Sequence, residues 1–365
     1  MSQARLTAHR LRVPLPKPRS LPQSSDPGAV LPQSLSLVVV QISSDAGKGL
    51  GFAAVSGSGS AALAMIEDDF APLLANANLL LTERLYAQAR KAFPEITRGG
   101  LAACAFSAID LALWDLKAKA AGLPLWQLLG GCRDSALVHI AETMFPGLSA
   151  DQVLEIAQPL LEQKMRGLRV GVGTGDAIRD ANKVQRIRDA VGEEVWFGVN
   201  GNQTFDVPTA VAFGRFLEEE LDADWFEDPT AANDVDGYAR LAGLLELPVA
   251  VGSTLGSESF APLVARTGAG VLRPDIGRVG GLTAMLDVIA VADAFHRPVV
   301  AHMGPLVGIH LACAKPNVTA VEYVRWLDPV FDGGPTLRED GRLAAPMVPG
   351  LGIELKKDAV KRFEL

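Results

Sequence analysis

The chain has 365 residues, of which 48% are hydrophobic and 21% charged, with a formal net charge of −8. This composition is that of a globular protein and excludes an intrinsically disordered chain, and the length favours two domains over one. The acidic charge argues against a nucleic acid or an anionic membrane surface as a partner.

The cysteines and the first residues predict a cytoplasmic location. Cys104, Cys132 and Cys313 lie far apart in the sequence without metal-ligand spacing, as is usual for buried cysteines in a reducing cytosol. Residues 1–20 hold arginines and prolines but no apolar core, so no signal peptide is expected. The apolar run around residues 38–40 has the length of a strand and is far too short to span a bilayer.

Residues 1–125 are expected to form a small α+β domain. A proline-rich opening leads to a predicted strand over residues 35–42, and the glycines of residues 43–51 favour a turn. Apolar residues at three-four spacing then predict helices over residues 61–74, 81–93 and 100–121.

Residues 126–325 repeat one module, in which a short apolar strand is followed by a polar residue and an amphipathic helix. The predicted strands are residues 137–140, 168–172, 195–199, 225–226, 248–251, 270–272, 298–301 and 320–321. Helices are expected over residues 176–191, 209–221, 235–245 and 282–296. Strands that alternate with helices imply a parallel sheet, and eight of them imply a closed barrel.

Polar residues close these strands at the edge where such barrels carry out their chemistry. They are Asn200, Glu227, Ser253, Asp275, His302 and Glu322. Because the carboxyl ends of parallel barrel strands meet at one mouth, these side chains predict an enzyme with its active site there. Residues 326–365 are rich in turns, and we expect them to pack back on the first domain.

Five motifs in this order resemble those of a known family. They are AFSAIDLALWDLKAKAAGLPLWQLLGG (105–131), NGNQ (200–203), FEDP (226–229), RPDIGRVGG (273–281) and PGLGIEL (349–355). The chain resembles the mandelate racemase/muconate lactonizing enzyme branch of the enolase superfamily over nearly its whole length. The resemblance implies a (β/α)7β TIM-like barrel, an α+β capping domain and a C-terminal segment that returns to the cap. Family members abstract the proton beside a substrate carboxylate and stabilise the enediolate on Mg²⁺.

The metal ligands of this family are only partly present. The family's three metal carboxylates end the third, fourth and fifth strands, where this chain has Asn200, Glu227 and Ser253. Mg²⁺ prefers hard oxygen ligands, and each missing negative charge removes several kcal/mol of attraction at an effective dielectric of about 20. We therefore expect Mg²⁺ to bind weakly here if it binds. The alternative is that the three residues are hydrogen-bonded polar groups of the barrel mouth.

The second strand also departs from the family pattern. It usually ends in Lys-x-Lys, and this chain has Arg169, Val170 and Gly171 instead. A guanidinium stays protonated, so this face of the mouth has no base, and the glycine is expected to open space in the site. Arg169 and Arg273 should both point inward, where they could clamp a substrate carboxylate. The alternative is a structural salt bridge of these arginines with Glu227 and Asp228.

The resemblance places the family's His–Asp dyad at His302 and Asp275, on the seventh and sixth strands. Asp275 would fix the tautomer and orientation of the imidazole, and His302 would transfer the proton. Glu322 matches a position that some members use as an electrophilic acid. Asn202, in the NGNQ motif, completes the predicted substrate-binding set with the two arginines. For an isolated histidine, a buried structural role would be the alternative.

These residues predict a lyase (dehydratase) or an isomerase (racemase or epimerase) that acts on a small organic or sugar acid with a single base. The alternative is a member that binds a small acid without turning it over, or that uses another mechanism. We expect a small carboxylate as ligand and, as for relatives that form dimers or octamers, a homo-oligomer. The cap loops at residues 20–29 and 52–60 are expected to set specificity, and their few charged residues favour a small or partly apolar ligand.

Overall fold

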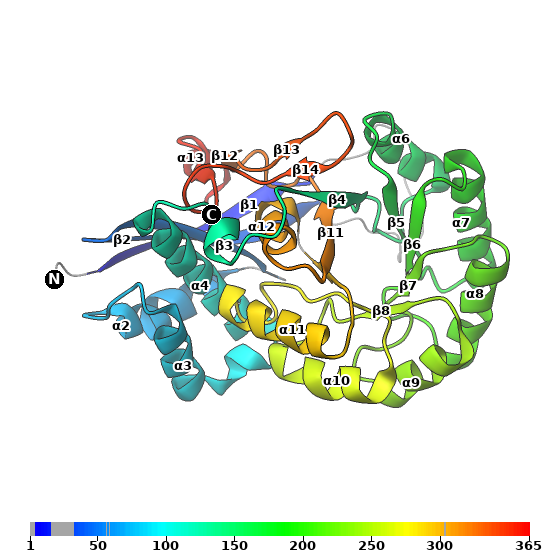
Figure 1. Cartoon of the computed structure of the whole chain (residues 1–365), viewed down its shortest axis with the longest axis horizontal. Helices are drawn as coiled ribbons and strands as arrows, with labels where there is room; N and C mark the ends of the chain where they lie inside the picture. Colours follow the sequence, from blue (N-terminus) through cyan, green and yellow to red (C-terminus); the bar gives the residue numbers. More distant parts are fainter. Residues whose placement is uncertain (1–3, 16–32, 56, 58, 303) are drawn as a thin grey trace.

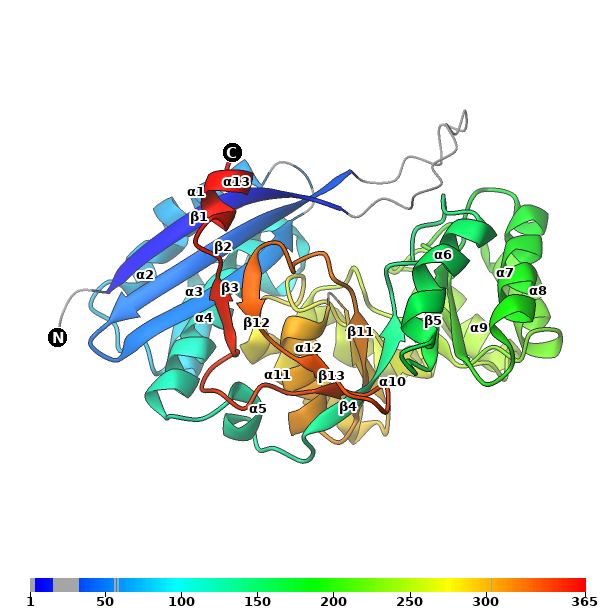
Figure 2. The same cartoon turned by 90° about the horizontal axis from the view of Figure 1, so that it is seen from above.

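The computed structural model describes residues 4–15, 33–55, 57, 59–302 and 304–365. They form a capping domain, a barrel and a C-terminal segment that touches both (Figures 1 and 2). The loop of residues 20–29 lies outside the described residues, as do residues 56 and 58 of the second predicted specificity loop. No helix in the described ranges is long and apolar enough to cross a membrane.

The cap begins with an antiparallel sheet of order β1-β2-β3. Its strands are β1 (Arg5–Pro14), β2 (Ser34–Ser44) and β3 (Gly47–Val55). The prediction of a turn over residues 43–51 was wrong for most of that range, because the hairpin turns between Ser44 and Gly47. Gly49 and Gly51 serve close packing instead: a Cβ at either position would come within 2.0 Å of a backbone oxygen in the helix below.

The helices of the cap cover one face of this sheet. They are α1 (Ser60–Ala64), the π-helical turn η2 (Met65–Phe70), α2 (Ala71–Leu74), α3 (Thr82–Ala92), the 3-10 turn η3 (Pro94–Thr97), α4 (Gly100–Ala120) and α5 (Leu125–Leu128). The long helix α4 packs on β3 and is buried along most of its length, since its small residues allow a close approach to the sheet.

The barrel is closed by eight parallel strands, as the sequence predicts. They are β4 (Ser135–Ile140), β5 (Gly167–Gly171), β6 (Trp196–Asn200), β7 (Trp225–Glu227), β8 (Val249–Val251), β9 (Val271–Leu272), β10 (Val299–Ala301) and β11 (Val318–Tyr323). Each strand pairs with the next, and β11 pairs with β4 to complete the ring. Their apolar side chains fill the core, so the fold class is confirmed.

Helices follow the first seven strands and surround the barrel. They are α6 (Ala150–Leu161), α7 (Ala177–Val191), α8 (Val207–Glu219), α9 (Val235–Leu244), α10 (Phe260–Thr267, after the 3-10 turn η4, Ser257–Ser259), α11 (Leu282–Ala294) and α12 (Pro305–Ala314). Side chains cap several of them: Ser149 forms a capping box with Gln152 at α6, and Asp206 accepts from Thr209 at α8.

The C-terminal segment runs along the barrel and ends on the cap. It contains β12 (Phe331–Gly333), β13 (Thr336–Leu337), β14 (Leu343–Ala344), β15 (Ile353–Leu355) and α13 (Ala359–Phe363). β14 pairs with the start of β4, and the backbone nitrogen of Leu365 donates to the oxygen of Arg10 in β1 at 3.1 Å. Figure 2 shows α13, in red, beside the strands of the cap.

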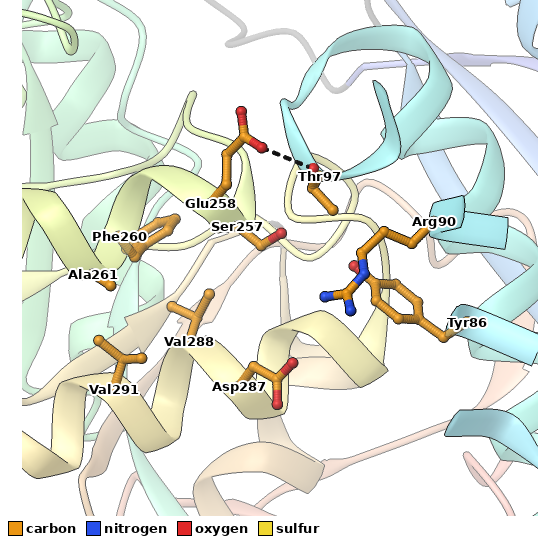
Figure 3. A pocket seen from close by; sticks show the side chains of 10 residues that line it. All are labelled: Tyr86, Arg90, Thr97, Ser257, Glu258, Phe260, Ala261, Asp287, Val288 and Val291. Carbon is orange, nitrogen blue, oxygen red and sulfur yellow. Dashed lines mark hydrogen bonds between the residues drawn. The ribbon is translucent and has the colours of Figure 1, made fainter. Parts of the chain in front are cut away.

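The cap meets the loops that follow the barrel strands, which places it at the carboxyl rim. The Thr97 hydroxyl lies within hydrogen-bonding distance (3.0 Å) of the Glu258 carboxylate after β8, and the indole nitrogen of Trp114 in α4 donates to Thr283 of α11 at 2.9 Å. Figure 3 shows this seam, where Tyr86 and Arg90 of α3 face Asp287 of α11 across a surface pocket of about 280 Å³. This pocket contains none of the polar residues that close the barrel strands.

Candidate active site

The strand ends bring six charged or ionisable residues together at the barrel mouth. Arg169 comes from β5, Glu227 ends β7, Arg273 follows β9 and Glu322 lies in β11. Asp275 and His302 follow β9 and β10 and are joined by a short parallel bridge between their backbones. Glu227, Asp275 and His302 lie at or just after the ends of their strands, whereas Arg169 and Glu322 lie inside β5 and β11.

Asp275 holds His302 in one orientation. One carboxylate oxygen of Asp275 accepts hydrogen bonds from the backbone nitrogens of Gly277 (2.8 Å) and Arg278 (3.0 Å). The other lies 3.0 Å from Nδ1 of His302. An ionised Asp275 can only accept, so Nδ1 carries the hydrogen and Nε2 is left with its lone pair. His302 keeps 13% of its side chain exposed, whereas the arginines beside it are buried.

Arg169 and Arg273 form a buried ion-pair network with Glu227 and Glu322. Arg169 donates to both oxygens of Glu227, from Nε at 2.8 Å and from Nη2 at 2.5 Å. Arg273 donates to Glu322 and lies 3.3 Å from Glu227 through its Nε. All four side chains are at most 2% exposed. The network therefore contains two positive and two negative charges with little access to solvent.

The network sets the protonation states around His302. Burial opposes ionisation of Glu227, but the two guanidinium groups outweigh it and lower its pKa to about 2. Burial also opposes ionisation of Glu322, but His302 and the two arginines hold the pKa of Glu322 well below its usual value. Nε2 of His302 lies 3.9 Å from Glu322. Burial disfavours the imidazolium, yet Glu322 and Asp275 together raise the pKa of His302.

The other predicted metal residues bond elsewhere. The side-chain oxygen of Asn200 accepts from the backbone nitrogen of Asn202 at 2.9 Å, and Asn202 in turn donates to the oxygen of Val172 at 2.8 Å. The Ser253 hydroxyl donates to Asp228, whose pKa is raised to about 6 by burial and by Glu227. The three strand-end residues are thus divided among separate hydrogen-bonded groups.

This arrangement does not fit Mg²⁺. Both oxygens of Glu227, the one carboxylate of the predicted set, already bind guanidinium groups. The two guanidinium charges already neutralise Glu227 and Glu322, so the network offers a divalent cation no net negative charge. In the described part of the chain, no group of three or more His, Cys, Asp or Glu side chains is arranged to hold a metal ion.

Gly171 does not open space in the mouth, so that expectation was wrong. A Cβ at this position would lie 1.8 Å from the carbonyl oxygen of Met144. The loop after β4 crosses the end of β5 here, and the sulfur of Met144 lies 2.7 Å from Nη1 of Arg169. Phe145 in the same loop stacks on Trp326. The wall opposite His302 is therefore backbone and apolar side chains rather than a cavity.

His139 also belongs to this network, although its sequence context did not single it out. It is fully buried in β4, with Nε2 3.3 Å from Nη1 of Arg273. Burial lowers the pKa of His139 to about 4, so the ring is neutral, and its Nε2 also lies 3.9 Å from Glu322. The ring also borders a cavity of about 70 Å³ at the amino ends of the strands. His139 is opposite Glu322 in the ladder between β11 and β4, and this pairing would have identified it as a member of the network. The pairing is visible only once the sheet is closed into a barrel.

Comparisons with known families agree with this geometry. Residues 152–359 match a family described as enolase C-terminal domain-like. Residues 14–130 match the N-terminal domain of mandelate racemase/muconate lactonizing enzyme. Together these matches span most of the barrel and most of the cap.

Among curated relatives, the chain is 32% identical over 333 residues to L-talarate/galactarate dehydratase of Salmonella typhimurium, covering 91% of this chain and 83% of that protein. It is 29% identical over 355 residues to 3,6-anhydro-alpha-L-galactonate cycloisomerase of Streptomyces coelicolor, covering 96% of each. A solved structure of the Salmonella dehydratase, liganded with Mg and L-lyxarohydroxamate, superposes with a TM-score of 0.90 at 30% identity, covering 100% of this chain and 94% of that one. A racemase from Streptomyces coelicolor with bound magnesium also gives a TM-score of 0.90, at 26% identity and 100% coverage of both chains.

Proposed function

Because this chain belongs to the mandelate racemase/muconate lactonizing enzyme branch of the enolase superfamily, we propose that it is a lyase or isomerase of small acids. It moves a proton at the carbon next to the carboxylate of a hydroxy acid or sugar acid. The relatives named above include a dehydratase and a cycloisomerase of sugar acids. Dehydration and epimerisation both begin with this proton transfer.

The observation that carries the proposal is the geometry of His302. Its Nδ1 faces Asp275 at 3.0 Å, which leaves Nε2 as the free basic nitrogen at the mouth. Glu322 and Asp275 stabilise the imidazolium once a proton arrives, and their effect appears as the raised pKa of His302. Glu322 enters the reaction as an anion rather than as an acid, because its pKa lies well below the usual value.

One base is enough for the reactions we propose. In a dehydration, His302 takes the proton from carbon and returns it to the departing hydroxyl group, which leaves as water. In an epimerisation, the enediolate must turn its other face to His302 before the proton returns to carbon, because return to the same face regenerates the substrate. A two-base racemisation is disfavoured, because the opposite wall contains Arg169 and the Met144 loop. We infer that Arg169 and Arg273, each 1% exposed, act on the substrate carboxylate through their charge rather than by direct contact, and that the half-buried Asn202 contacts a substrate hydroxyl.

Solvent exchange tests the proposal without knowledge of the product. The native protein is incubated in D2O with a panel of aldonic and aldaric acids that begins with galactarate and talarate, and proton NMR follows the carbon beside the carboxylate. For at least one acid we expect the proton at that carbon to be lost. Deuterium replaces it where the abstraction reverses or an epimer forms, whereas a dehydration turns that carbon into a ketone and places deuterium on the neighbouring carbon. His302→Ala should lose the exchange by about 100-fold or more, as is typical for loss of a general base. His296→Ala, a change at an exposed histidine after α11, is the matched control and should keep it.

A second function is favoured by one specific observation. The guanidinium groups and the oxygens of Asn200 and Ser253 are all engaged within the protein, as expected of a site that binds an acid without enolising it. Saturable binding of a panel acid with no exchange would establish this alternative. Exchange that persists in His302→Ala would instead reject His302 as the base.

A further inference from the structure

The most unusual feature of the mouth is its pair of buried arginines. Arg169 and Arg273 reach the same carboxylate, Glu227, from opposite sides of the barrel, through β5 and β9. Each is 1% exposed. Buried charges of this kind persist only when they are paired with opposite charges, and Glu227 and Glu322 supply these.

The charges of the residues at the strand ends fit together when they are compared with the family's three metal carboxylates. Asn200 and Ser253 are neutral, so Glu227 is the only carboxylate among the three residues that end β6, β7 or follow β8. The four charges of Arg169, Arg273, Glu227 and Glu322 sum to zero, so the two guanidinium groups already neutralise both carboxylates without a metal ion. Asn200 and Ser253 are neutral at two of the positions where the family has carboxylates, and Arg169 and Arg273 both contact the third, Glu227. Solved structures of relatives contain magnesium.

We propose that Arg169 and Arg273 take the place of the divalent cation at this site, so that the protein holds its fold and binds its carboxylate ligand without Mg²⁺. Arg169 is fixed to Glu227 through two hydrogen bonds, and Arg273 is fixed between Glu227, Glu322 and His139. Positive charge held in this way needs no reorganisation when an anion arrives. The identity of the ligand rests on the proposed function, whereas the independence from metal stands on the ion pairs alone.

Manganese provides a direct test, because the EPR signal of free Mn²⁺ disappears when the ion binds. We expect an equimolar mixture of the native protein and Mn²⁺, at about 100 µM each, to keep the full signal of the free ion, whereas a site with a micromolar Kd would remove about nine tenths of it. A thermal midpoint that is unchanged between EDTA and excess Mg²⁺ should accompany this result. One tightly bound Mn²⁺ per chain, displaced by Mg²⁺, would overturn the proposal, and this measurement needs no variant.

A matched pair of variants tests whether the charge of Arg273 is what prevents metal binding. Arg273→Gln removes one positive charge and leaves Glu227 and Glu322 under-compensated, so Mn²⁺ should bind at least about tenfold more tightly than to the native protein. Arg273→Lys keeps the charge and should leave Mn²⁺ binding unchanged. Circular dichroism checks that both variants fold. Equal Mn²⁺ affinity in the two folded variants would reject charge replacement as the cause.

The metal test and the exchange test can fail separately. Proton exchange that EDTA abolishes would refute the arginine replacement and leave the proposed function intact. No exchange in a protein that also binds no Mn²⁺ would refute the proposed function and leave the replacement intact. Exchange that continues in EDTA would support both.

Discussion

At the scale of single residues, two carboxylates determine the orientation and the pKa of His302. Asp275 is fixed by two backbone N–H groups and determines which nitrogen of the imidazole is free. Glu322 is fixed by Arg273 and contributes charge from 3.9 Å. Burial alone would lower the pKa of His302, so its raised value depends on both anions.

Asp275→Asn should therefore shift the pH dependence of the reaction. A base must be neutral to act, so kcat/KM falls as the pH drops through the pKa of His302, above its ordinary value of 6.5. Removing the charge of Asp275 lowers this pKa and moves the acidic limb to lower pH, while the rate falls because the ring is held less well. The pH profiles of native protein and variant check this. An acidic limb that does not move would show that another group titrates.

At the scale of elements, the acidic residues of the long motif in α4 join helices and strands rather than take part in chemistry. The N-cap residue of helix α11 is Gly281, with φ 115°, and it has no side chain that could cap the helix. Asp110 supplies the cap from the other domain, because it accepts from the backbone nitrogen of Thr283 at 2.8 Å and from its hydroxyl at 2.7 Å. A Cβ at Gly281 would lie 2.6 Å from Asp110, which explains the glycine.

Asp110→Asn should change stability in a way that depends on pH. Burial raises the pKa of Asp110 to about 7, so its contribution is complete below the unfolded value of 3.8 and is lost as the pH rises through 7. Relative to the native protein, the neutral variant should gain on the order of 3 kcal/mol between pH 4 and pH 8. Urea unfolding at several pH values measures this gain. Asp68→Asn, an exposed change in the same domain, is the control, and an equal trend in both variants would contradict the assignment.

At the scale of the whole molecule, α4 fastens the three parts of the chain together. Besides the contact of Asp110 with the barrel, Asp115 accepts from the backbone nitrogens of Leu50 in β3 at 2.8 Å and of Leu351 in the C-terminal segment at 2.7 Å. Asp115 is fully buried, and Lys119 pairs with it at 2.6 Å. Through these two carboxylates, α4 is joined to the barrel and to the C-terminal segment by buried polar contacts.

We expect the cap and the barrel to unfold in a single transition. Separation of the two would remove the Asp110 cap from α11 and leave the backbone N–H and the hydroxyl of Thr283 without this partner, which is costly. Tryptophans lie in both parts, including Trp114 in the cap and Trp225 in the barrel, so fluorescence reports on both. Its urea midpoint should coincide with that of far-UV circular dichroism. Two separated midpoints would show that the parts are joined less firmly than these contacts imply.

The sequence by itself determined the barrel, its order of strands and the mouth where His302, Asp275, Glu227 and Glu322 meet. These features follow from local patterns: apolar runs of strand length, helical periodicity and a polar residue at each strand end. The lone strand predicted for the cap sheet was correct, but β1 and most of β3 were missed. A proline ends β1 and more prolines follow it, and the glycines of β3 are typical of turns when seen without the helix that packs on them.

Only the tertiary structure decided how the charges are paired and which positions are filled. The sequence left open whether Arg169 and Arg273 clamp a substrate or form salt bridges, and it did not include His139 in the network. It also suggested open space at Gly171, where the carbonyl of Met144 lies. These outcomes depend on which strands are neighbours around the ring and on where a loop crosses a strand end. Contacts between residues far apart in the chain leave no periodic trace in the sequence, so the folded barrel alone determines them.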